Sequence, residues 1–219
     1  MVLKILFCGY RDWAIQTFDV LSFWSSLNGH HLSIATNPEA FNIHTNRTSF
    51  DVTILVGWSE ILSAEYVGSN YTVVVHPSDL PEYAGGSPIQ HQIIDGLTKT
   101  KATLLKASDK IDAGPIIDKE DLSLEGDLKN IFSNLADASF ELLKRFLLSY
   151  PNHQETEQDR SSLKKRRTPE MSEIKLEDFQ LSTAQEIYNK IRALQDPYPN
   201  AFVVCRNGSK LYLTGASHG

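Results

Sequence analysis

The chain has 219 residues, which at about 150 residues per domain corresponds to one full domain and a smaller appendage. Hydrophobic residues make up 41% and charged residues 22%, a composition that excludes a long disordered chain. Lys and Arg total 21 against 27 Asp and Glu, and the net charge of −6 argues against a protein that coats nucleic acid electrostatically.

The apolar run at the N-terminus is too short for a signal peptide. It covers residues 1–8, and Gly9 and Arg11 interrupt it. No other stretch reaches the roughly 18 apolar residues of a membrane span. We therefore expect a cytoplasmic protein with no membrane partner. Cys8 and Cys205 each lie in a strand-like run and are expected to be buried, reduced thiols.

The first 150 residues alternate strand-like and helix-like patterns, which is typical of an α/β sheet. An apolar strand at 2–8 is followed by a helical pattern at 12–27. Continuous apolar runs predict parallel strands covered on both faces, at residues 31–35, 52–57 and 71–75. Two further helices and two weaker strands complete this part: helices at 88–96 and 127–150, strands at 102–106 and 115–118.

The composition changes after residue 150. Residues 152–162 are polar, which indicates a linker or an excursion over the surface. A helical pattern at 182–194 precedes two strand-like runs, at 201–205 and 210–214, that flank the hairpin signal Asn207-Gly208. We predict a Rossmann-like, mostly parallel α/β catalytic domain with a C-terminal helix and β-hairpin appendage, divided into residues 1–150, a linker at 151–166 and the appendage at 167–219.

Several common chemical signatures are missing from the sequence. The turn after the first strand, residues 9–12 (GYRD), matches neither a Walker loop nor the dinucleotide-binding glycine pattern, and G-x-S-x-G is absent. We therefore expect no dinucleotide cofactor. None of the seven histidines forms a pair with metal-ligand spacing, which predicts no metal site.

Two loops remain that can carry chemistry. Residues 76–88 (HPSDLPEYAGGSP) follow the strand at 71–75, at the carboxyl end where open α/β sheets bind ligands. Residues 111–116 (IDAGPI) form an acid-bearing turn. His76 and Asp112 can form an acid/base pair, although each alone is also typical of a strand-end cap or a turn.

The two loops together resemble the folate-dependent formyltransferases, which include the glycinamide ribonucleotide, methionyl-tRNA and nucleotide-sugar enzymes. The family pattern is Asn-x-His-Pro-Ser-x-Leu-Pro-x-x-x-Gly-x-x-Pro, followed by an Asp-x-Gly-x-Ile loop. The matching positions are His76, Pro77, Ser78, Leu80, Pro81, Gly85, Pro88, Asp112, Gly114 and Ile116. The resemblance implies catalysis by His76 and Asp112. It also implies that the formyl donor, N10-formyltetrahydrofolate, is bound by Ser78, Gly85, Pro88 and Gly114.

In this family an amine attacks the formyl carbon of the donor, and the tetrahedral intermediate collapses to a formamide. The oxygen that becomes negative needs a hydrogen-bond donor, and the amine needs a proton acceptor. The resemblance therefore implies that Asp112 orients His76 and favours its cationic form, which can hydrogen-bond the oxyanion. The carboxylate or a water would take the amine proton.

One departure affects this mechanism. The family Asn, two residues before the His, is Val74 here, which cannot donate a hydrogen bond. Losing one oxyanion donor typically costs about 10²- to 10³-fold in rate, so a working enzyme needs a substitute. We expect His76 to act alone with a water, and the alternatives are Gln90, His91 and Lys106.

The C-terminal part narrows the resemblance. Residues 167–170 (RTPE), 191–194 (IRAL) and 197–202 (PYPNAF) resemble elements of methionyl-tRNA and sugar formyltransferases that the glycinamide ribonucleotide enzymes lack. A sizeable β-barrel follows in the tRNA enzymes, whereas 17 residues follow Phe202 here. Together with the acidic charge, this favours a nucleotide-sugar N-formyltransferase without a nucleic-acid partner. Its acceptor would be a UDP- or dTDP-linked amino-dideoxy sugar for surface or flagellar glycans, and the 76–88 loop loosely resembles the enzyme of pseudaminic acid pathways.

Substrate contacts are expected from Tyr10, Arg11 and Lys106. Arg11 lies beside a helix N-terminus, where it can meet a phosphate, and Tyr10 can stack on a base. Residues 164–167 (KKRR) could grip a diphosphate, although such a run is also typical of a solvated surface.

The sequence leaves other functions and the assembly state open. The alternatives are a phosphoribosylglycinamide formyltransferase and, because of Val74, a non-catalytic folate- or nucleotide-binding homologue. The hairpin at 201–214 is too small to be stable alone, so it should pack on the main domain or on a second subunit. We therefore expect a homodimer.

Overall fold

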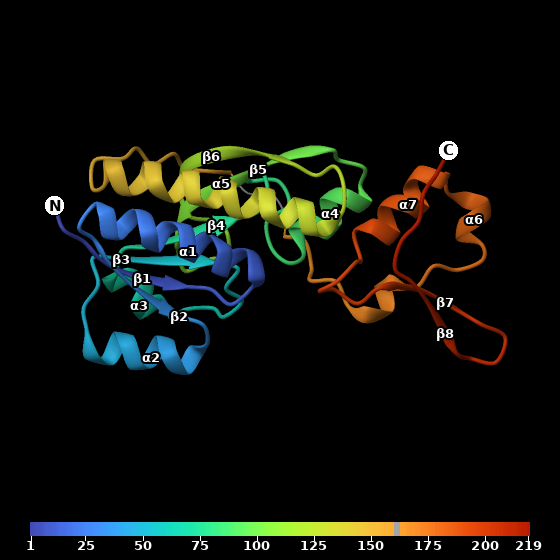
Figure 1. Cartoon of the computed structure of the whole chain (residues 1–219), viewed down its shortest axis with the longest axis horizontal. Helices are drawn as coiled ribbons and strands as arrows, with labels where there is room; N and C mark the ends of the chain where they lie inside the picture. Colours follow the sequence, from blue (N-terminus) through green and yellow to red (C-terminus); the bar gives the residue numbers. More distant parts are fainter. Residues whose placement is uncertain (160–162) are drawn as a thin grey trace.

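A six-stranded sheet forms the centre of the structure, a computed structural model that describes residues 1–159 and 163–219 (Figure 1). The strands are β1 (Lys4–Cys8), β2 (His31–Ala35), β3 (Val52–Val56), β4 (Thr72–His76), β5 (Lys99–Lys106) and β6 (Ile116–Ser123). Their order is β2-β1-β3-β4-β5-β6, with β1 to β4 parallel and the hairpin β5–β6 antiparallel to β4. The predicted α/β class with a mostly parallel sheet is confirmed.

The β5–β6 hairpin is longer than its apolar runs predict, because much of its length is polar and only partly covered. Its antiparallel direction matters for the site. His76 at the end of β4 pairs with Thr103, while Lys106 at the end of β5 pairs with Val73. The chain therefore leaves β5 at the level of Val73, short of His76, and the loop at 107–115 starts from there.

Two layers of helices enclose the sheet (Figure 1). Helices α1 (Asp12–Leu27) and α5 (Leu128–Ser149) cover one face, and α2 (Pro38–Arg47) and α3 (Ala64–Ser69) lie against the other. A short helix, α4 (Pro88–Ile94), follows the loop after β4. The helices predicted at 12–27, 88–96 and 127–150 are confirmed as α1, α4 and α5. In the described ranges, no helix combines the length and the hydropathy that crossing a bilayer requires.

Sequence analysis did not predict α2 and α3, and their burial explains why. Phe41 is the one buried residue of α2, and α3 has none, so neither presents an apolar stripe. Both begin instead with a capping side chain: Asn37 accepts from the amide of Ala40 at 2.9 Å, and Ser63 from that of Tyr66 at 3.2 Å.

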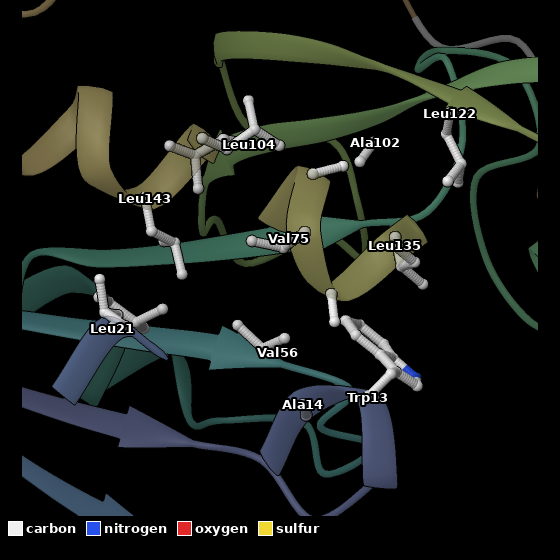
Figure 2. Close-up of a cluster of buried hydrophobic side chains, with 14 of the residues drawn as sticks. Trp13, Ala14, Leu21, Val56, Val75, Ala102, Leu104, Leu122, Leu135 and Leu143 are labelled. Atoms are coloured by element: carbon white, nitrogen blue, oxygen red, sulfur yellow. The ribbon is translucent and has the colours of Figure 1, made fainter. Parts of the chain in front are cut away.

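The main core lies between the sheet and helices α1 and α5 (Figure 2). Leu21 of α1 and Leu143 of α5 pack there against residues of the three strands β3, β4 and β5. Among these residues are Val56, Val75 and Leu104. A smaller core on the opposite face contains Leu6, Cys8, Phe41 and Leu55. The odd and even positions of each central strand are therefore both buried, which explains the continuous apolar runs.

The two cysteines differ in their surroundings. Cys8 is buried at the end of β1, and burial raises the pKa of its thiol to about 12. Cys205 is exposed, so the prediction that it is buried is wrong. Its strand ends one residue earlier, at Val204, and Cys205 already belongs to the hairpin turn.

The C-terminal part extends from the α4 end of the main domain (Figure 1). It consists of η1 (Pro169–Ser172), α6 (Asp178–Leu181), α7 (Ala184–Arg192) and the hairpin β7 (Ala201–Val204) and β8 (Lys210–Leu213). The hairpin packs on α7 through Ile174, Ile191, Leu194 and Ala201. Arg192 joins this part to the main domain, because its Nη1 donates to the Leu124 carbonyl at 2.6 Å.

The polar segment predicted as a linker at 151–166 runs back along the main domain; of it, residues 160–162 lie outside the described residues. Thr156 exchanges two backbone hydrogen bonds with Ile116, at 2.7 and 2.8 Å. Lys164 donates to the carbonyl of Ala84 and accepts from the amide of Gly86, at 2.8 and 2.9 Å. The segment is thus attached next to both loops that sequence analysis singled out.

The burial of α5 leads to a stability prediction. Leu142 is fully buried in the core, so Leu142→Ala should lower the free energy of unfolding by about 2–5 kcal/mol. Leu148 on the same helix is 66% exposed, and Leu148→Ala should change it by less than about 0.5 kcal/mol. Urea unfolding of both variants measures the difference, and equal losses would contradict the core assignment.

Candidate active site

His76 lies at the end of β4 with 6% of its surface exposed. Its Nε2 is 3.1 Å from the carbonyl oxygen of Tyr83, and its Nδ1 is 3.4 Å from Oδ2 of Asp112. A carbonyl oxygen only accepts, so Nε2 carries a proton in this arrangement. Both ring nitrogens face acceptors, and only the doubly protonated ring can donate to both.

Asp112 reaches His76 from the loop between β5 and β6. Its backbone is left-handed, with φ of +50°, and its carboxylate is mostly buried. Oδ2 accepts from the amide of Gly85 at 2.8 Å in addition to facing His76. The backbone N–H donor fixes the orientation of the carboxylate towards the imidazole. The structure therefore brings the two predicted catalytic residues together.

A cavity of about 620 Å³ contains this pair, within the usual size range of ligand sites. Three side-chain atoms that line it are buried and find no hydrogen-bond partner among the described residues: Trp58 Nε1, Gln90 Oε1 and Arg167 Nε. Buried polar atoms are normally paired, so these atoms are suited to a polar ligand. Within the described part of the chain, the cavity therefore offers two unpaired donors and one unpaired acceptor to a polar ligand.

Cationic side chains gather at one part of the cavity wall, around the ring of Tyr198. Arg11 and Arg166 both lie close enough to oppose the rise that burial causes in the pKa of the Tyr198 phenol. Arg166 Nη2 also contacts Ser59 Oγ at 3.5 Å. Burial lowers the pKa of the Arg167 guanidinium beside them. This part of the cavity is suited to an anionic group.

Three of the four residues predicted to bind the donor line the cavity: Gly85, Pro88 and Gly114. A Cβ on Gly114 would lie 1.9 Å from the Lys106 carbonyl oxygen, and one on Gly85 would lie 2.5 Å from that of Lys164. Close backbone packing thus explains both glycines. Ser78 is fully buried away from the cavity lining, and its hydroxyl donates to the Glu82 carbonyl at 2.7 Å.

Of the three predicted substrate contacts, Arg11 and Lys106 contribute to the cavity lining and Tyr10 does not. The Tyr10 hydroxyl donates to Ser59 at 2.6 Å, and its ring lies under the Arg11 guanidinium and beside Trp58. The Lys106 ammonium pairs with Glu155 at 3.4 Å and lies over the ring of Tyr71, although Lys106 also contributes to the lining. Its ammonium is therefore already neutralised from within the chain.

Val74 leaves an apolar wall where the family pattern has Asn. It stands between Leu55 and Leu105 in the sheet register, and all three line the cavity. Of the alternative donors, Gln90 lines the cavity and is buried. His91 contacts the Lys165 carbonyl at 2.9 Å and lies outside the lining. The geometry favours Gln90 over His91 and over Lys106.

Three further residues belong to this region although sequence analysis did not assign them to the site. Trp58 follows the carboxyl end of β3, and a position at the carboxyl end of a parallel strand was also the reason for choosing His76. The same criterion could therefore have identified Trp58 from the sequence. Tyr198 lies within the PYPNAF element. Gln158 contacts the Asp112 loop from a polar segment, and no local pattern marks it.

Comparisons with known proteins agree with this arrangement. A formyl transferase family model matches residues 30–139, and a model of the formyl transferase C-terminal domain matches residues 168–219. Methionyl-tRNA formyltransferase of Lysinibacillus sphaericus is 32% identical over 168 residues, which are 73% of this chain and 52% of that protein. The chain spans about half the length of the curated relatives that it matches.

Solved structures share the fold over the whole described chain. Methionyl-tRNA formyltransferase from Clostridium thermocellum has a TM-score of 0.79 at 27% identity, covering 96% of this chain and 97% of that one. A sugar N-formyltransferase from a Shewanella species has a TM-score of 0.78 at 15% identity, covering 99% and 98%. The chain belongs to the formyl transferase family, whose members draw the formyl group from N10-formyltetrahydrofolate.

Proposed function

We propose that this protein transfers a formyl group from N10-formyltetrahydrofolate to the amino group of a nucleotide-linked amino-dideoxy sugar. The observation that carries the proposal is the 3.4 Å contact between His76 Nδ1 and Asp112 Oδ2 inside a cavity of about 620 Å³. An imidazole and a carboxylate at this distance supply a positive charge for the developing oxyanion and an acceptor for the amine proton. Pairs of this kind often tighten when substrate binds.

The donor, when bound, supplies a formyl carbon that an amine can attack. His76 carries a proton on Nε2 and, in its cationic form, a second proton on Nδ1 facing Asp112. The positive ring stabilises the negative charge that develops on the formyl oxygen. The Asp112 carboxylate holds that ring and, directly or through a water, accepts the proton that the attacking amine loses. When the bond between the formyl carbon and N10 breaks, this proton would pass to the nitrogen of the leaving tetrahydrofolate, so the transfer balances.

Gln90 is the side chain that we propose in place of the family Asn. Its amide is buried and lines the same cavity as His76, and a hydrogen bond from Gln90 opposes the rise that burial causes in the pKa of the Tyr198 phenol. The amide NH₂ carries two N–H donors, so one can bond the Tyr198 hydroxyl while the other donates to the formyl oxygen. The Gln90 amide, which reaches the cavity from α4, would thus donate the hydrogen bond that the family Asn donates from the strand.

The acceptor class follows from the remaining cavity wall. Arg11, Arg166 and Arg167 match the charge of a diphosphate, and Tyr198 and Trp58 offer aromatic surface to a base. We therefore favour a UDP- or dTDP-linked sugar, with the pseudaminic acid pathway as the narrower hypothesis. The donor contacts at Gly85, Pro88 and Gly114, a homodimer and a cytoplasmic location remain part of this proposal. Ser78 instead holds the loop after β4 through its bond to Glu82.

Methionyl-tRNA is the second candidate acceptor, because the matched curated relatives are methionyl-tRNA formyltransferases. One solved enzyme of that name is also covered over 97% of its chain. Val74 in turn favours a homologue that binds folate without catalysis. These candidates differ in which acceptor, if any, becomes formylated.

Substitution of the catalytic pair tests the chemistry. His76→Asn and Asp112→Asn should each lower kcat by roughly 10²- to 10⁴-fold, because the first removes the charge that stabilises the oxyanion and the second removes the proton acceptor. Chromatographic assay of the formylated product measures kcat, and thermal unfolding checks that the fold is kept. The control is His31→Asn, an exposed histidine on the edge strand β2, which should leave kcat unchanged. Near-normal rates for His76→Asn would remove the imidazole from the mechanism.

A panel of acceptors tests the substrate. With N10-formyltetrahydrofolate, we expect formylation of a UDP- or dTDP-linked amino sugar and a KM that rises with salt, since the acceptor would be held by arginines. Mass spectrometry of each product gives the answer. Formylation of methionyl-tRNA or glycinamide ribonucleotide alone would contradict the sugar proposal. Tetrahydrofolate binding without any product would favour the non-catalytic homologue.

A further inference from the structure

We propose that Gln158 is the positioning residue of Asp112, and that it holds the catalytic carboxylate against His76. The inference deepens the proposed function and rests on it for its kinetic part. Gln158 Nε2 donates to the carbonyl oxygen of Asp112 at 3.1 Å and to that of Gly114 at 2.6 Å. One carboxamide thus spans the turn from both sides of Ala113.

The orientation of this carboxamide is fixed by its partners. Both are carbonyl oxygens, which only accept, so the NH₂ group must face them. The Gln158 amide oxygen is buried and has no partner among the described residues, so a flipped amide would lose both bonds. Two donors on one nitrogen are therefore committed to the Asp112 loop.

The loop needs such support because its own backbone is unfavourable. Asp112 is a non-glycine residue with φ of +50°, a conformation that persists only where the surroundings enforce it. Gly114 packs so closely that a Cβ would lie 1.9 Å from the Lys106 carbonyl oxygen. Within the loop, the bond from the Ala113 amide to the Lys110 carbonyl is long, at 3.4 Å. Among the described residues, Gln158 is the side chain that bonds the carbonyls of both Asp112 and Gly114.

Gln158 is in turn held by the segment that precedes it. Two residues earlier, Thr156 pairs with Ile116 in both directions, which extends the sheet by one bridge beyond β6. Glu155 accepts from the Tyr71 hydroxyl at 2.7 Å and pairs with Lys106, and His153 contacts the same hydroxyl. The segment at 153–158 therefore connects the start of β4 rigidly to the catalytic loop.

The consequence concerns the chemical step more than substrate binding. Gln158 does not belong to the cavity lining, so its loss should not remove a substrate contact. Asp112 Oδ2, by contrast, must keep its bonds to Gly85 and its contact with His76 at the same time. Misplacement of a catalytic group by about 1 Å typically costs about 10²-fold in rate.

Two variants and a matched control test the inference. Gln158→Glu keeps the size of the side chain but cannot donate to a carbonyl, and Gln158→Ala removes the group altogether. Both should lower kcat by about 10- to 100-fold, while KM for donor and acceptor stays within about twofold. Gln154→Ala, at an exposed glutamine of the same segment, should leave both constants unchanged.

A second measurement is independent of activity. The Gly85 amide donates to Asp112 Oδ2, whereas the neighbouring Gly86 amide donates to Lys164, so hydrogen exchange of Gly85 should accelerate in the Gln158 variants while Gly86 serves as reference. If the wild-type protein formylates no acceptor, the proposed function fails and Gly85 exchange alone decides on the positioning role. Unchanged Gly85 exchange would overturn that role, as would a kcat that is unaffected or a KM that rises in proportion to the loss of kcat/KM.

Discussion

Oδ2 of Asp112 meets two groups that lie 27 and more residues earlier in the chain, the Gly85 amide and the His76 imidazole. This one oxygen joins the loop after β4 to the loop after β5, and the rest of the site is arranged around that junction. The carboxylate is mostly buried, so its orientation depends on these contacts and is not averaged by solvent. Without this contact, the Tyr83 carbonyl would be the acceptor that remains beside the His76 ring among the described residues.

The direction of β5 explains why the junction needs help. Because β5 runs antiparallel to β4, the chain leaves β5 beside Val73. The loop that follows must therefore turn back towards the other end of β4 to bring Asp112 to His76. The left-handed Asp112 and the crowded Gly114 are the local signs of that path. The polar segment at 153–158 returns along the edge of the hairpin and supports the loop from outside. An element without regular structure thus acts as part of the scaffold.

The C-terminal part also contributes to the site. Tyr198 enters the cavity wall next to Gln90, and Arg166 and Arg167 precede η1. Arg192 is buried at the junction with the main domain, where its guanidinium donates to the carbonyls of Leu124 and Gly126. Fixing α7 in this way also fixes the turn that carries Tyr198. The cationic wall of the cavity therefore depends on two parts of the chain that share no sheet.

Local sequence patterns predicted many of the strands and helices. Apolar runs indicated β1 to β4 and helical periodicity indicated α1 and α5, because burial of one or both faces leaves a repeating pattern in the sequence. The resemblance of two loops singled out His76 and Asp112. Tertiary structure alone decided that Lys106 pairs with Glu155, that Cys205 is exposed and that Gln158 donates to the carbonyls of Asp112 and Gly114. A single polar residue leaves no repeating pattern in the sequence that would identify its partner. Its partner depends on the path of the whole chain, which brings distant segments together.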